Sequence, residues 1–147
     1  MKPVIQEEPT GCGIAAVAAI VGVTYAHANA VAGALGIFAD DPRLWSDTAH
    51  IRQLLAQFGR HVPASPQPFR SWKSLPACAL LAVKWHVEAG RPFWHWVVFA
   101  RENGQALVLD SKQSLKVHCR TDLGRLKPKW YLRVSMKSRS RVCNPNR

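Results

Sequence analysis

The sequence predicts an α+β fold in which N-terminal helices precede a mostly antiparallel sheet. In the first 60 residues apolar side chains recur at helical spacing, whereas β-branched and aromatic residues typical of strands dominate from residue 78 onward. A connector containing Pro63, Pro66 and Pro68 separates the two patterns. Helices followed by strands are typical of the α+β class. We expect one domain over residues 1–134 and a basic, flexible tail over 135–147.

Three helices are predicted before the connector. The first covers the alanine-rich residues 12–23, and Thr24 is expected to cap a second that ends near Leu35. Ser46 or Asp47 is expected to cap a third helix. Apolar residues with i, i+3, i+4, i+7 spacing form its buried face: Ile51, Leu54, Leu55 and Phe58.

Strands are predicted after the connector, near residues 78–87, 93–100, 105–110, 114–118 and 129–134. Asn103 and Gly104 form a turn typical of a β-hairpin between the second and third of them. With the turn centred there, the numbers of paired residues sum to about 207. This register places Asp110 close to His95.

Cys12 lies between two glycines at the expected start of the first helix. Unpaired amides and the positive end of the helix dipole favour a thiolate at such a position. A single cysteine is equally well explained as a small core residue, so partners elsewhere in the chain decide between the two. His95 and Asp110 are such partners, because an imidazole between a thiol and a carboxylate is the arrangement of Cys-His nucleophilic catalysis.

Four segments carry a resemblance to a known family: QEEPTGCG, SLPACALLAVKWH, HWVVF and LVLDS, between residues 6 and 134. In this order they resemble the bacteriocin-processing cysteine peptidases, which have a papain-like fold. The resemblance implies that Cys12 is the nucleophile, His95 the general base and then acid, and Asp110 the orienting carboxylate. It also implies that Gln6 donates to the oxyanion. The substrate it implies is a double-glycine leader peptide, although the same triad suits another protein target, as in an effector or toxin protease.

The residues around His95 indicate an aromatic cleft. Trp85, Trp94 and Trp96 fall in the strands beside it and are expected to contact substrate. His86 also follows a tryptophan, but no carboxylate lies at the matching hairpin distance, so we interpret it as a strand residue beside the cleft. The spacing of histidines and cysteines predicts no metal site, and no cofactor is expected.

Positive charge is concentrated at the C-terminal end. Residues 111–147 carry eleven Lys and Arg against one Asp, whereas residues 1–110 carry nine against eight acidic residues. A basic segment can bind nucleic acid or an acidic protein, or it can be a solvated face. No zinc-finger, RNP-like or helix-turn-helix motif accompanies it, which disfavours nucleic acid. The alternative to an enzyme is a non-catalytic papain-like module that recognises an acidic peptide or nucleic acid through this segment.

The sequence also bears on location. The longest apolar stretch, Ile14 to Val23, is about half of the roughly 20 residues that cross a bilayer, and acidic residues rather than basic ones precede it. The four cysteines are far apart without a CxxC pair, so we expect free thiols. A cytoplasmic location is therefore expected, with secretion as an effector the alternative. The oligomeric state stays open.

Overall fold

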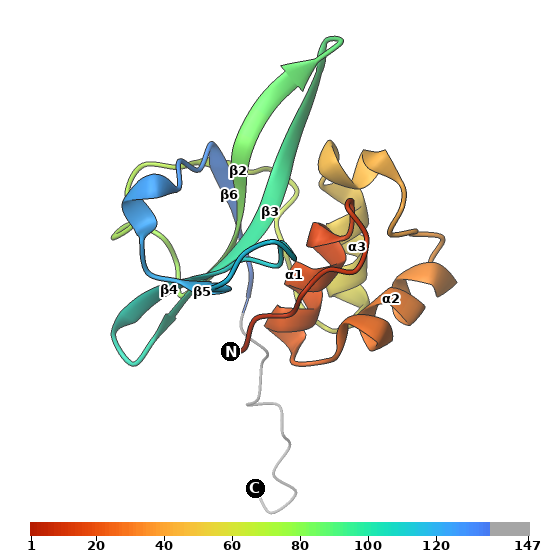
Figure 1. The fold of residues 1–147 in the computed structure, drawn as a ribbon, viewed down its shortest axis with the longest axis horizontal. Helices are drawn as coiled ribbons and strands as arrows, with labels where there is room; N and C mark the ends of the chain where they lie inside the picture. Colours follow the sequence, from red (N-terminus) through yellow and green to blue (C-terminus); the bar gives the residue numbers. More distant parts are fainter. Residues whose placement is uncertain (136–147) are drawn as a thin grey trace, which may run out of the picture.

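The computed structural model describes residues 1–135, in which three α-helices pack against one side of a six-stranded antiparallel sheet (Figure 1). The strands lie in the order β1-β6-β2-β3-β4-β5. The predicted α+β class is confirmed. The predicted basic tail, apart from Ser135, lies outside the described residues.

The helices follow the expected boundaries closely. Helix α1 (Cys12–Val21) is buried from its first residue to Ile20. Helix α2 (Tyr25–Ala34) is capped by Thr24, whose hydroxyl accepts the N–H of His27 at 3.1 Å.

Helix α3 (Ala49–Gln57) begins two residues after Asp47, whose carboxylate accepts the Ala49 N–H at 2.7 Å. Thr48 occupies the cap position itself, without a side-chain bond, so the capping carboxylate predicted at Asp47 acts from one residue further out. A short 3₁₀ helix, η1 (Pro42–Trp45), precedes α3.

Strands β2 (Cys78–Glu88), β3 (Arg91–Glu102) and β4 (Gln105–Leu109) form the centre of the sheet. Glu102 pairs with Gln105 and Val98 with Leu109, so the predicted hairpin register is confirmed. At one edge β6 (Trp130–Arg133) pairs with β2 and with the short β1 (Gln67–Pro68).

The strand predicted at residues 114–118 is wrong. That segment forms turns, and the strand that pairs with β4 is the shorter β5 (Cys119–Arg120). In the segment 114–118 the apolar side chain of Val117 is 63% exposed because nothing packs over it. The 3₁₀ helix η2 (Leu123–Arg125) then leads the chain back to β6.

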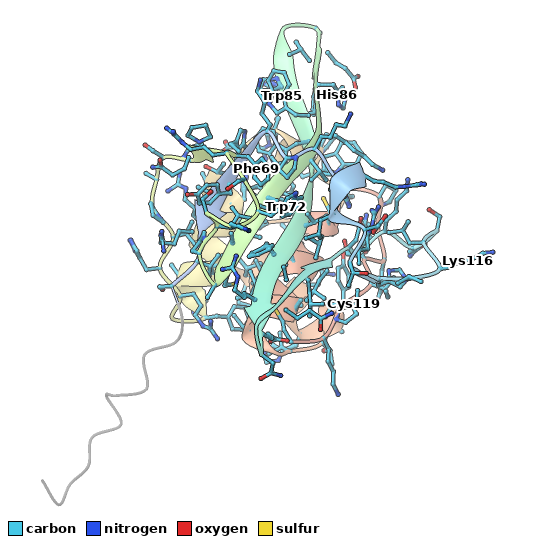
Figure 2. The ribbon with its side chains drawn as sticks, turned by 90° about the vertical axis from the view of Figure 1, so that its left-hand side faces the viewer. Phe69, Trp72, Trp85, His86, Lys116 and Cys119 are labelled. Carbon is cyan, nitrogen blue, oxygen red and sulfur yellow. The ribbon has the colours of Figure 1, made fainter. Side chains whose placement is uncertain are left out.

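The two faces of the sheet have separate cores. On the helical face α1 packs against β3 and the other helices, and Trp96 and Leu54 are fully buried there. The opposite face buries Phe99 and Val108 under the segment that carries Phe69 and Trp72 (Figure 2).

A β-bulge interrupts the pairing of β2 with β3. Val83 pairs with His95, but His86 pairs with Phe93, so β2 holds one residue more than β3 between these pairs. Lys84 has a φ of +55°, a conformation that side chains other than glycine rarely adopt. Beyond the bulge the two strands extend past the body of the sheet as a long hairpin (Figure 1).

Within residues 1–135 no single helix is both long and apolar enough to cross a bilayer. Helices α1 and α2 reach that length and composition only together, and their axes meet at 112°.

Close packing at Gly13 gives a stability test. A Cβ at this position would lie 2.9 Å from Cγ1 of Ile51 and 3.2 Å from Cδ1 of Trp96. We expect Gly13→Val to lower the free energy of unfolding by about 1–3 kcal/mol, because a fully packed site must shift to admit the side chain.

Gly33 in α2 is the matched control, since nothing lies within 4 Å of its missing Cβ. Gly33→Ala should keep or raise the stability, because alanine favours a helix over glycine. Urea unfolding of both variants checks this, and equal effects would contradict the packing described here.

Candidate active site

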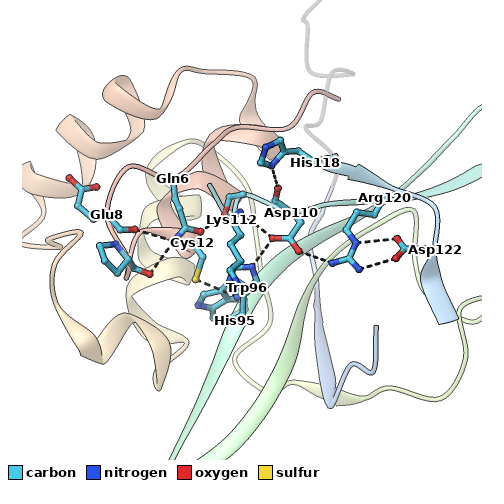
Figure 3. A network of polar contacts seen from close by, with 12 residues as sticks. Gln6, Glu8, Cys12, His95, Trp96, Asp110, Lys112, His118, Arg120 and Asp122 are labelled. Carbon is cyan, nitrogen blue, oxygen red and sulfur yellow. Dashed lines mark hydrogen bonds and ion pairs between the residues drawn. The ribbon is translucent and has the colours of Figure 1, made fainter. Parts of the chain in front are cut away.

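Cys12 lies against an open stretch of the β3 edge. Strand β4 ends at Leu109, opposite Val98, so it leaves the next residues of β3 without a strand on that side. The Trp96 N–H donates instead to Sγ of Cys12 at 3.5 Å (Figure 3). The end of β4 therefore provides the space in which the start of α1 meets β3.

His95, next to Trp96 in β3, joins the thiol to a carboxylate. Its Nε2 lies 2.8 Å from Oδ1 of Asp110, the residue that directly follows β4. Burial lowers the pKa of His95, but hydrogen bonds to Asp110 and Cys12 outweigh it and raise this pKa to about 9. The site therefore favours a charged imidazolium.

Asp110 is a buried carboxylate with three donors. Besides His95, the Lys112 N–H donates to Oδ1 at 3.2 Å and Nη1 of Arg120 to Oδ2 at 3.1 Å. Arg120 also bonds to Asp122 at 3.0 Å, which fixes its guanidinium (Figure 3). Although burial favours the neutral acid, His95, Lys112 and Arg120 lower the pKa of Asp110 to about 2.

Gln6 lies beside Cys12, with both ends of its side chain hydrogen-bonded (Figure 3). Its N–H donates to the Ser111 carbonyl at 3.0 Å, and its Oε1 accepts the Ser111 hydroxyl at 2.7 Å. Its Nε2 donates to the carbonyl oxygens of Glu8 and Pro9, each at 3.0 Å. An oxyanion can therefore accept a hydrogen bond from this amide only after one of these two bonds opens.

The loop between Gln6 and Cys12 is anchored on α2 and on the turn that follows it. The Tyr25 hydroxyl donates to the Glu8 carboxylate, and the Thr10 hydroxyl donates to the Ala39 carbonyl. Burial and the neighbouring Glu8 carboxylate raise the pKa of Tyr25, so the hydroxyl keeps its proton.

A pocket of about 260 Å³ opens beside His95. Gln6, Lys84, His95 and Lys112 contribute its polar wall, and Trp45, Phe93 and Trp94 contribute apolar surface. Cys12 is not among the residues that line it and is 0% exposed. Access to the sulfur therefore requires a movement of the groups around it, of which the Gln6 side chain is one.

The three tryptophans expected to contact substrate have different positions. Trp94 lines the pocket, and its Nε1 has no hydrogen-bond partner within residues 1–135. Trp96 corrects the expectation: it is fully buried, donates from Nε1 to the Leu44 carbonyl at 3.0 Å, and packs against Trp94 and Trp130. Its indole is therefore core, and only its backbone N–H reaches Cys12.

Trp85 also departs from the expectation, because the bulge carries it away from His95. It does not line the pocket, and its ring lies 4.5 Å from Nζ of Lys129. His86 does line the pocket, but its ring nitrogens contact Glu88 and the Lys84 carbonyl rather than the triad.

Sequence reasoning missed several groups that hold the site. These are Arg120, the Lys112 N–H, the Ser111 hydroxyl and the Trp96 N–H. Arg120 reaches Asp110 because β5 pairs with β4, a pairing hidden by the wrongly predicted strand. Within residues 1–135 no cluster of three or more His, Cys, Asp or Glu side chains could hold a metal ion.

Comparison with protein-family models, curated proteins and solved structures gives no match to this chain. The chemistry of the site is therefore argued from its own geometry. A thiol, an imidazole and a carboxylate lie in series, with the imidazole hydrogen-bonded to the carboxylate, beside a pocket and the uncapped start of α1. Such a series can activate a nucleophile and transfer a proton.

The His95–Asp110 pair makes stability depend on pH. The raised pKa of His95 adds stability that is complete below about pH 6.5 and is lost as the pH rises through about 9. The lowered pKa of Asp110 adds stability that is complete above about pH 3.9 and is lost as the pH falls through about 2. The free energy of unfolding of wild type should therefore exceed that of His95→Gln by the largest amount between about pH 4 and 6.5.

Urea unfolding at several pH values measures this difference. Val117→Ala, a change at an exposed side chain that does not titrate, is the control and should differ from wild type by the same amount at every pH. A pH-independent difference for His95→Gln would contradict the ion pair.

Proposed function

We propose that this chain is a thiol hydrolase of papain-like fold that cleaves a peptide or isopeptide bond, similar to the bacteriocin-processing cysteine peptidases. The observation that supports it best is that Asp110 bonds one nitrogen of His95 while Cys12 lies beside the same residue, its Sγ 3.5 Å from the Trp96 nitrogen. This is the relationship of nucleophile, base and orienting group that covalent catalysis needs. Double-glycine leader peptides and the target of an effector protease are both candidate substrates.

In the proposed reaction the Cys12 thiolate attacks the carbonyl carbon of the scissile amide. The imidazolium of His95 then gives its proton to the leaving amine, and a thioester remains on Cys12. His95, now neutral, takes a proton from water, whose oxygen attacks the thioester carbon. The C–S bond then breaks, which releases the acid and restores the Cys12 thiolate beside the His95 imidazolium. Asp110 stays ionised throughout, because its pKa of about 2 keeps it unable to accept that proton.

The proposed oxyanion donors are the N–H of Cys12 and the amide of Gln6. The start of α1 has no side-chain cap, so no capping side chain competes with an oxyanion for the first amides of the helix. When Gln6 leaves the carbonyls of Glu8 and Pro9, the same movement uncovers the sulfur and frees Nε2 to donate. Access and oxyanion stabilisation are coupled through this one side chain.

Alkylation tests the nucleophile. At pH 6 we expect Cys12 to react with iodoacetamide faster than Cys119, although Cys119 is exposed and Cys12 is buried, because the thiolate is the reactive form. Cys78 should react least, since burial raises its pKa to about 11. Peptide mass spectrometry measures each rate.

His95→Gln is the matched variant for this experiment. It should slow alkylation of Cys12 by about 10-fold or more and leave Cys119 unchanged, because thiolate fraction sets the rate. Labelling of Cys119 alone, or equal Cys12 rates in wild type and His95→Gln, would argue against the assignment.

Gln6→Ala separates access from catalysis. We expect kcat to fall by about 10²- to 10³-fold, as for loss of one oxyanion donor, while alkylation of Cys12 becomes faster because the sulfur is uncovered. Gln53→Ala, which removes an exposed glutamine from α3, is the control and should change neither rate. Full activity of Gln6→Ala would remove Gln6 from the mechanism.

A second candidate function is a peptide-binding module without catalysis, and the full burial of Cys12 favours it. A peptide library offered to wild type and Cys12→Ala distinguishes the two. Cleavage by wild type alone supports the hydrolase, whereas equal peptide binding by both proteins without cleavage supports the module.

A further inference from the structure

A second pocket, of about 520 Å³, adjoins the candidate active site on the other side of the bulge. We call it the cationic groove, and its charged and aromatic lining consists of Lys84, Trp85, Arg120, Arg125, Lys127 and Lys129. None of the residues that line it is acidic. Figure 2 shows Trp85, which lies in β2 next to His86.

Most of this positive charge is not neutralised within the fold. Arg120 is paired with Asp110 and Asp122. Among residues 1–135 no ion pair joins Lys84, Lys127 or Lys129 to a carboxylate. Like charges held together without counterions attract an anionic ligand.

Two contacts connect the groove to the proposed triad. Lys84 lines both the groove and the pocket beside His95, because the bulge sets it between them. Arg120 lines the groove and donates to the Asp110 carboxylate. A chain bound in the pocket beside His95 therefore meets the groove as it continues past Lys84.

We propose that the cationic groove binds an acidic segment of a peptide that extends from the candidate active site. The role of this segment in cleavage rests on the proposed function, but its binding does not. A peptide suits the groove better than a nucleic acid, because Trp85 is the one aromatic ring in it and Lys129 already lies over that ring. Single-stranded nucleic acids are usually bound by several rings that stack on successive bases.

Binding is measured on Cys12→Ala, so that no cleavage interferes. The probe is a fluorescein-labelled peptide with four consecutive glutamates, compared by anisotropy with the same peptide carrying glutamines. The groove variant combines Arg125→Gln, Lys127→Gln and Lys129→Gln. The control removes equal charge with Lys2→Gln, Lys73→Gln and Lys116→Gln, exposed residues that line neither the groove nor the pocket beside His95.

We expect the glutamate peptide to bind more tightly than the glutamine peptide, and added salt to weaken its binding. The groove variant should raise its Kd about 10-fold, while the control variant should change it less than about 2-fold, because net charge alone acts weakly at a distance. Equal binding of the two peptides, or equal loss in both variants, would overturn the proposal. The proposal would also be overturned if a single-stranded RNA bound more tightly than the glutamate peptide and the groove variant lost that RNA binding.

Cleavage distinguishes this proposal from the proposed function. In the chain with Cys12 intact, the groove variant should raise KM for an acidic peptide about 10-fold, leaving kcat and the cleavage of neutral peptides unchanged. Equal KM values would overturn the proposal while the hydrolase stands. Tight groove-dependent binding without cleavage of any peptide would support the acidic-peptide site and contradict the hydrolase.

Discussion

The candidate site depends on the point at which β4 stops. If β4 continued past Leu109, its backbone would pair with the Trp96 N–H, and the start of α1 could not reach β3. Because the chain leaves the sheet there, Ser111 pairs with Gln6 instead, and Cys12 takes the acceptor position beside Trp96. The unpaired stretch of one strand therefore organises three segments that are far apart in the sequence.

The second constraint is the buried charge of Asp110. A carboxylate removed from water is unfavourable unless donors surround it, and here an imidazole, a backbone amide and a guanidinium do so. These donors come from β3, from the turn after β4 and from β5. The carboxylate thus ties the orientation of His95 to the packing of the sheet edge, and Arg120 extends that network to the surface through Asp122.

Much of this arrangement could be predicted from local pattern. The Asn103–Gly104 turn specifies its own register, and the register brings Asp110 to His95; the glycines around Cys12 mark the start of the helix. The environment of the site could not be predicted in this way. Arg120 reaches Asp110 across a loop whose length hides the pairing, and Trp96 is core because α1 and η1 cover it, which no spacing within β3 indicates. The strand predicted at residues 114–118 failed for a related reason, since alternation predicts a strand only where another element covers the apolar face.

The bulge at Lys84 has a consequence for how the hairpin beyond it can vary. Side chains alternate between the faces of a strand, so one additional residue reverses the phase of all that follows on β2 while β3 keeps its own. On β2, odd-numbered residues such as Val83 share a face with His95 before the bulge, whereas the even-numbered His86 shares that face with Phe93 after it. A change in length of two residues beyond the bulge would preserve the face that His86, Glu88 and Phe93 present to the pocket beside His95. Removal of the bulge residue would leave His86 opposite Phe93, so regular pairing would replace the bulge and the hairpin would keep the same faces.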